Sequence, residues 1–144
     1  MAITTNAIAN SFKKELLEGK HDFTASTGSV FKLAMYTSAA TLGKSTTSYT
    51  TGSETSSPAG YTAGGKALVN VGTSLASNVA IVDFSNLSFT NVTLTARGAL
   101  IYNTSNSNTA VAVLDFGGDK TATSGTFTIQ FPAFTTSAAI LRIS

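Results

Sequence analysis

One stretch, residues 94–119, limits what this chain can fold into more than any other. Two apolar arms, Leu94 to Asn103 and Ala110 to Asp119, flank a short polar loop of Thr, Ser and Asn residues. Because β-branched and aromatic residues suit strands, while Asn and Ser suit turns, this pattern predicts a β-hairpin. Arg97 and Asp115 lie near the outer ends of the arms, where they could pair across the two strands. We expect this hairpin to be the central pair of a sheet.

Strand and turn signals of the same kind recur along the chain. The first predicted strand places Phe31, Leu33 and Met35 on one face, which indicates a strand with a single buried face. Together with a turn at residues 117–119, short strands at this spacing predict an all-β fold, an antiparallel β-sandwich or jelly roll. The predicted strands cover residues 30–37, 66–72, 79–84, 87–89, 92–102, 110–116, 126–131 and 138–143.

Two segments lack a regular pattern. Residues 1–10 are small and polar, which predicts a flexible N-terminal arm, either frayed or ordered only on a neighbouring subunit. Residues 11–144 then form a single domain, as expected for 144 residues. Within it, residues 38–60 are rich in Ser, Thr, Gly and Ala and predict a long surface loop with Tyr49 as its one large anchor. Loops of this length are usually functional or disordered.

Residues 11–18 form the one convincing helix candidate. Asn10 or Ser11 can cap it, and a glycine follows its last residue. Phe12 and Leu16 form a short apolar stripe along it. Two helical turns are marginally stable alone, so we expect this helix to dock on the sheet or on a partner.

Composition narrows the classes of function. Charged residues make up 11% of the chain and the net charge is +2, too little for a nucleic-acid surface. The absence of cysteine excludes disulfides and thiolate metal sites. Neither a signal peptide nor an apolar run of membrane-spanning length is present, which predicts a soluble protein made in a cytoplasm. A neutral, Thr-rich surface is weakly protected by charge repulsion and favours self-association.

Residue types that carry catalysis are sparse. His21 is the only histidine, and its isolation predicts a structural hydrogen bond rather than a catalytic triad or a histidine metal cluster. The few acidic residues of the β region predict turn caps or an arginine partner rather than a calcium site. The four tyrosines could line a sugar site, but their spread along the chain favours positions at the edge of the core. We therefore predict no enzyme activity, no catalytic residue, no cofactor and no metal.

Five segments follow one another along almost the whole chain: residues 11–23, 31–37, 60–65, 96–103 and 112–117. Together they resemble a family of small proteins encoded by tailed bacteriophages, whose members look like virion structural proteins. The resemblance implies a capsid decoration (cement) protein that binds and stabilises the assembled head. A tail, fibre or baseplate protein, including a glycan-binding host-recognition module, is the alternative. The implied location is the virion, assembled in the host cytoplasm.

The resemblance also implies the partners. They are other virion proteins, either the major capsid protein or tail proteins, and neither nucleic acid nor a membrane. Strand edges, arms and loops can supply such contacts without a charged site. A homo-oligomer is expected, with a trimer as one arrangement. The predicted partner-binding residues are Asn10, Phe12, Leu16, Tyr49 and Tyr61.

Overall fold

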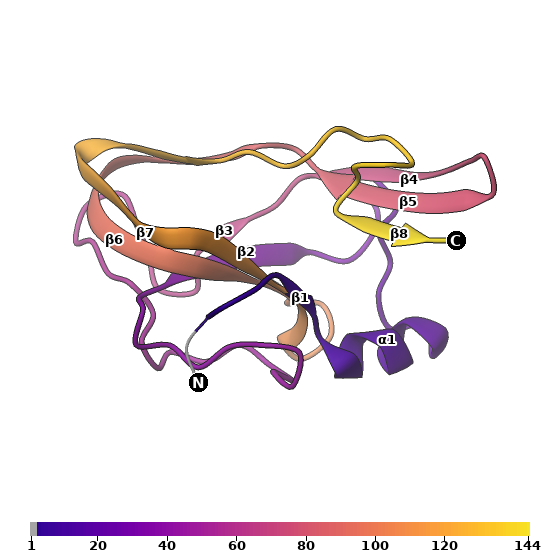
Figure 1. Ribbon diagram of the computed structural model, residues 1–144, viewed down its shortest axis with the longest axis horizontal. Helices are drawn as coiled ribbons and strands as arrows, with labels where there is room; N and C mark the ends of the chain where they lie inside the picture. The colour runs from indigo at the N-terminus through magenta and orange to yellow at the C-terminus, as the bar shows by residue number, and fades with distance from the viewer. Residues whose placement is uncertain (1–2) are drawn as a thin grey trace.

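The computed structural model describes residues 3–144, which form eight strands and one short helix. In chain order these are β1 (Ala7–Ile8), α1 (Asn10–Leu17), β2 (Phe31–Tyr36), β3 (Lys66–Ala67), β4 (Asn70–Ala76), β5 (Val79–Phe84), β6 (Leu87–Asn103), β7 (Thr109–Ile129) and β8 (Leu141–Ile143). Two antiparallel sheets result, one ordered β1-β7-β6-β2-β3 and the other β4-β5-β8 (Figure 1). The prediction of an all-β, sandwich-like fold with one N-terminal helix is confirmed.

The predicted hairpin is present and is longer than its apolar arms. β6 and β7 are 17 and 21 residues long, and they pair from Leu87 opposite Ile129 to Asn103 opposite Thr109. This two-stranded ribbon runs beside β2 in one layer, bends, and returns in the other layer toward β5 (Figure 1). Both layers therefore contain part of the same hairpin. The ribbon joins runs that the sequence predicts as separate strands, residues 87–89 with 92–102 and 110–116 with 126–131.

The turn predicted at residues 117–119 is wrong, because these residues form a large bulge inside β7. Ala96 of β6 lies opposite Lys120 of β7, and Gly98 lies opposite Asp115, so two steps along β6 correspond to five along β7. The first glycine of the bulge has a φ of +80°, in the left-handed region that glycine tolerates. Bulges bend and twist the strand that carries them, so this one helps the ribbon to pass from one layer to the other.

Two further strand predictions are corrected. The strand predicted at 66–72 is divided: β3 pairs with β2 in the larger sheet, and β4 pairs with β5 in the smaller one. Leu68 lies buried between them, where the chain crosses between layers. The strand predicted at 138–143 is reduced to β8, because the residues before it form a turn.

The prediction of a single buried face for β2 is also wrong. Ala34 and Tyr36, on the face opposite Leu33, are as fully buried as Leu33 itself. The loop over residues 38–60 covers this second face, and the hydroxyl of Tyr36 donates to the carbonyl of Thr50 at 2.6 Å. A mostly polar loop therefore covers an apolar strand face, which the alternation of residues in β2 does not show.

The N-terminal segment differs from a free arm. Ile3 is fully buried, and β1 pairs with the edge of β7. The side-chain oxygen of Asn6 accepts a hydrogen bond from the backbone N–H of Asp115 at 2.6 Å. An unpaired strand edge favours such pairing, since it offers a row of free main-chain groups. Residues 1–2 of the predicted arm lie outside the described residues.

The helix begins and ends with different kinds of cap. Its N-cap is Ala9, in an extended conformation, so the predicted cap by Asn10 or Ser11 is wrong. The backbone N–H of Asn10 instead donates to the carbonyl of Lys44 in the long loop at 2.7 Å. At the other end, Gly19 takes a φ of +73° and ends the helix as predicted. Tertiary contacts therefore hold the first turn.

Candidate functional site

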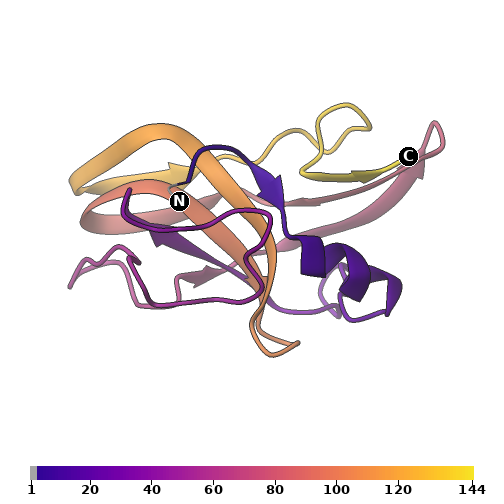
Figure 2. The same ribbon diagram turned by 60° about the horizontal axis from the view of Figure 1, so that its bottom comes forward.

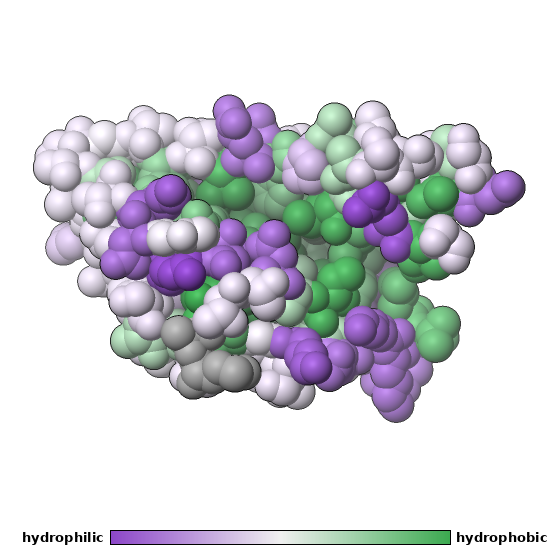
Figure 3. Space-filling view, in the orientation of Figure 1, coloured by the Kyte–Doolittle hydropathy of each residue, from purple (hydrophilic) through white to green (hydrophobic). Residues whose placement is uncertain are grey.

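An apolar groove of about 790 Å³ lies between α1 and the sheet β4-β5-β8. Figure 3 shows apolar side chains gathered in this hollow, with hydrophilic residues around it. Phe12, Leu16 and Leu17 line it from the helix, and Ile8 closes it on the side of β1. Leu17 is 91% exposed, so the helix wall presents apolar surface that the chain itself does not cover.

The opposite wall is one face of the smaller sheet, and its residues are aligned by the strand register. Val82 pairs with Leu141, and Ala80 pairs with Ile143, so these four side chains form two rows on one face. Leu75 continues the outer row on β4, opposite Ala80. The inner row meets the core at Leu141, while Ile143 is 60% exposed. The groove therefore opens outward from the core along an apolar sheet face.

Aromatic packing sets the position of the helix relative to the sheets. The Phe12 ring lies 4.7 Å from the His21 ring and 6.0 Å from the Phe23 ring, measured between centroids. Phe23 stacks on Phe31 of β2 at 4.5 Å, and Phe31 contacts Phe84 of β5. This chain of rings connects α1 to both sheets, and its first three members, Phe12, His21 and Phe23, line the groove.

A buried polar network also fastens α1. The side-chain amide of Asn103 donates to Nδ1 of His21 at 3.0 Å, which leaves the ring proton on Nε2, 3.3 Å from the Glu15 carboxylate. Asn106 donates to the same carboxylate at 3.1 Å. Burial holds the pKa of His21 below its usual value, although the nearby Glu15 opposes this shift. His21 thus has the structural role expected from the sequence, and the network joins α1 to the loop end of the β6–β7 hairpin.

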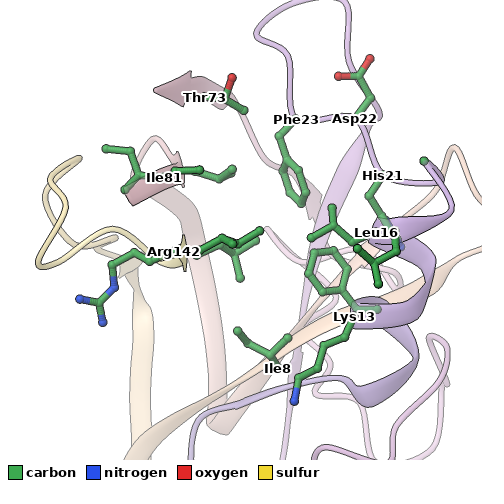
Figure 4. A pocket seen from close by; sticks show the side chains of 16 residues that line it. Ile8, Lys13, Leu16, His21, Asp22, Phe23, Thr73, Ile81 and Arg142 are labelled. Carbon is green, nitrogen blue, oxygen red and sulfur yellow. The ribbon is translucent and has the colours of Figure 1, made fainter. Parts of the chain in front are cut away.

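Charges on the rim are distributed unevenly (Figure 4). The charged end of Lys13 lies toward the side of the groove marked by Ile8, and the Asp22 carboxylate lies at the opposite end. The Arg142 guanidinium points away from the helix and donates to the carbonyl of Ser137 at 2.7 Å. Asp22 accepts two hydrogen bonds from Thr24, which lower the pKa of its carboxyl. Among the described residues, neither Lys13 nor Arg142 has an ion-pair partner. One end of the groove therefore carries a single lysine.

A second cluster lies away from the groove and holds the long loop in place. In this Glu54 cluster (Tyr49, Glu54, Tyr61 and Gly64), the carboxylate accepts hydrogen bonds from the Tyr49 hydroxyl at 2.6 Å, the Tyr61 hydroxyl at 2.7 Å and the Gly64 N–H at 2.7 Å. Tyr102 stacks on Tyr49, with ring centroids 4.7 Å apart. Burial, with Glu54 adding to it, raises the pKa of Tyr49 and Tyr61, so both hydroxyls remain protonated donors.

The five predicted partner-binding residues do not share one surface. Phe12 and Leu16 line the groove, whereas Asn10 lies at the start of α1 outside it. Tyr49 and Tyr61 belong to the Glu54 cluster, where Tyr61 is buried and Tyr49 is partly buried. Tyr36 and Tyr102 are buried as well. The tyrosines therefore converge inside the molecule and do not form an exposed face for stacking on sugars.

The remaining acidic groups have separate environments. Asp115 pairs with Arg97 across the hairpin as predicted, and it also accepts a hydrogen bond from the N–H of Gly117. Asp83 is 1% exposed, and burial raises the pKa of its carboxyl. Within residues 3–144, no group of three or more His, Asp or Glu side chains is placed to hold a metal ion. In the same part of the chain, no helix has the length and apolar character needed to cross a membrane.

Sequence reasoning found the helix wall of the groove and missed the sheet wall. Leu141 and Ile143 lie on the same face of β8, as their alternation predicts. The sequence does not indicate that this face lies opposite α1. Their partners on β5 come from a region separated by about half the chain. Comparison with protein-family profiles, curated proteins and solved structures finds no match.

Proposed function

We propose that this protein is a non-enzymatic structural component of a tailed-bacteriophage virion, a decoration protein that binds and stabilises the assembled head. The observation that carries the proposal is the groove between α1 and the sheet β4-β5-β8. Its walls present Leu17 and Ile143 to solvent, although both would be stabilised by burial. An exposed apolar hollow with a polar rim is a typical site for contact with another protein.

The rest of the molecule supports a role in assembly. The polar groups of the Glu54 cluster and of the network around His21 fix a loop and a helix to the sheets. The network around His21 fixes the helix that forms one wall of the groove. A rigid surface loses less conformational freedom on association, which favours binding.

The experiment uses particles made without this protein. The purified chain is added back, and its position is determined by immunogold electron microscopy and its occupancy by quantitative mass spectrometry. We expect labelling distributed over the head, together with release of DNA at a higher temperature than from bare particles. Label confined to the tail would replace head decoration with the tail, fibre or baseplate role. The absence of label anywhere on the particle would overturn the proposal.

A matched pair of variants links this result to the groove. Ile143→Asp places a charge in the groove, while Val69→Asp places one at a comparably exposed site outside it. We expect the first variant to lose occupancy on particles and the second to retain it.

A further inference from the structure

We propose that His21 and Asn103 form an acid-sensitive latch. When the His21 ring takes up a second proton, α1 and the segment that follows it are released from the loop end of the β6–β7 hairpin, while the sheets stay paired. Since α1 forms one wall of the groove, its release opens the groove. The inference concerns the isolated chain and does not depend on a role in a virion.

The orientation of the Asn103 side chain is fixed by a backbone partner. The N–H of Ser105, which can only donate, lies 2.9 Å from Oδ1 of Asn103. Nδ2 of Asn103 therefore faces Nδ1 of His21 at 3.0 Å, and it also donates to the carbonyl of Lys20 at 3.4 Å. Because Nδ2 is a donor without a lone pair to offer, Nδ1 of His21 must be the unprotonated ring nitrogen. The site is therefore built for the neutral ring.

A second proton on the ring has no acceptor in this arrangement. Nε2 already carries the proton of the neutral ring, so the new proton goes to Nδ1, where it points at the NH2 group of Asn103. Turning the Asn103 amide over would offer Oδ1 to His21, but it would direct the NH2 group at the N–H of Ser105. Both arrangements bring two donors together where the side chains of His21 and Asn103 are fully buried. A buried donor without an acceptor is unfavourable, so protonation weakens the latch.

The charged groups around the ring act in opposite directions. The Glu15 carboxylate of α1 lies 3.3 Å from Nε2 and attracts a positive ring, whereas the ammonium of Lys20, in the segment after the helix, repels it. The carboxylate of Asp22 accepts hydrogen bonds within its own turn. β2 contributes the ring of Phe31, and the hairpin end contributes uncharged amides. Burial outweighs the attraction of Glu15 and holds the pKa of His21 below its usual value, which agrees with the geometry at Nδ1.

The segment that the latch holds is weakly stable without its tertiary contacts. α1 is 8 residues long, and two helical turns are marginal in isolation. In both Figure 1 and Figure 2, α1 lies at the outside of the molecule, beside the loop end of the β6–β7 hairpin. Its polar contacts with that end pass through His21 and Glu15, whereas β6 and β7 pair with each other from Leu87 to Asn103. Weakly held segments open locally while the sheets stay folded, so losing the latch frees the helix first.

The test follows the isotope-labelled full chain by NMR between pH 7.5 and 5. Ring signals report the titration of His21, and amide hydrogen exchange, corrected for its intrinsic dependence on pH, reports local opening. We expect the ring to titrate below its ordinary value of 6.5, and the protection of the α1 amides to fall about tenfold between pH 6 and pH 5, because the released state binds the proton more tightly. Protection along β6 and β7 should stay unchanged. A ring that titrates at or above 6.5, constant protection of α1, or an equal loss along β6 and β7 would overturn the inference.

Asn103→Asp tests the meeting of two donors directly, because a carboxylate keeps an acceptor for the N–H of Ser105 and offers another to a protonated Nδ1. We expect this variant to raise the pKa of His21 above that of the wild type and to keep α1 protected at pH 5. Asn108→Asp adds the same charge at an exposed position of the same loop and should behave as the wild type does. Equal behaviour of the two variants would overturn the role of Asn103 in the latch. If Asn103→Asp does not fold, the wild-type titration still decides the inference.

Discussion

The two places where an irregular or helical segment meets the sheets are completed in different ways. At the Glu54 cluster, the long loop lies directly on β2, and one carboxylate receives three hydrogen bonds from the chain itself. At the groove, α1 stands away from the sheet, and Leu17 and Ile143 remain exposed. Lys13 on the groove rim also has no ion-pair partner among residues 3–144. The first region is completed from within the chain, whereas the second leaves apolar side chains uncovered.

This difference predicts that one region contributes to the stability of the fold and the other to association. Residues of the Glu54 cluster should matter for the free energy of unfolding, because their partners belong to the same chain. Residues of the groove rim should matter for association, since covering an apolar side chain contributes about 1.5–3 kcal/mol only when a partner is present. Substitutions in the two regions therefore test the comparison directly.

The largest expected effect is at Gly65, in the turn that carries the Glu54 cluster. Gly65 has a φ of +77°, and an added Cβ would lie 1.8 Å from the carbonyl oxygen of Leu33. We expect Gly65→Ala to lower the free energy of unfolding by about 4 kcal/mol, measured by urea denaturation. Gly43→Ala is the control, because its Cβ would meet no atom within 4 Å. Equal stability of the two variants would show that this turn does not hold the loop tightly.

Glu54→Ala comes next, because it removes the acceptor of three hydrogen bonds. Hydrogen bonds to a charged group contribute more than neutral ones, so we expect a loss of about 3 kcal/mol in the free energy of unfolding. Glu18→Ala removes an exposed carboxylate from ion pairs on the helix surface and should leave stability almost unchanged. Similar losses in both variants would contradict the assignment of Glu54 as the centre of this region.

His21 should give a smaller effect that depends on pH. Burial lowers its pKa in the folded protein, so below the ordinary value of 6.5 the unfolded chain binds the proton more readily. The free energy of unfolding should therefore be highest above pH 6.5 and should fall as the pH drops below it. In His21→Gln, urea midpoints measured between pH 7.5 and 5 should lose this slope. An unchanged slope would assign the pH dependence to another group.

The smallest effect on stability is expected at the groove rim. Leu17→Ser and Ile143→Ser remove apolar side chains that are exposed in the isolated chain, so the free energy of unfolding should stay within about 0.5 kcal/mol of the wild type. Thermal or urea denaturation of each variant provides the measurement. A loss as large as that of Glu54→Ala would show that these residues belong to the protein's own core, and would remove the contrast between the two regions.

Local patterns predict most of the fold. The hairpin, the ion pair between Arg97 and Asp115, the single helix and the glycine that ends it are all readable from neighbouring residues. The strand boundaries inside the hairpin cannot be predicted in this way, because glycine occurs both in turns and in bulges. Whether Gly117 ends a strand or kinks it depends on the register with β6. That register depends on pairing with residues far away in the sequence, so a short stretch of sequence does not determine it.

The candidate site was predictable only in part for the same reason. The apolar stripe of α1 predicts docking, and Phe12 and Leu16 do line the groove. The tyrosines are far apart in the chain, so their convergence on Glu54 depends on the path of the long loop. The β8 wall faces the helix only because the ribbon brings the two layers together. Pairs within one element can be predicted, and pairs between layers cannot.

The bent ribbon has a mechanical consequence. β1 attaches to β7 in one layer, and β8 attaches to β5, which continues directly into β6 in the other. A force applied between β1 and β8 is therefore transmitted along β6 and β7, and not only across the interface between the two sheets. The hydrogen bonds between β6 and β7 would then be loaded together in shear, so the molecule would resist mechanical unfolding as one unit.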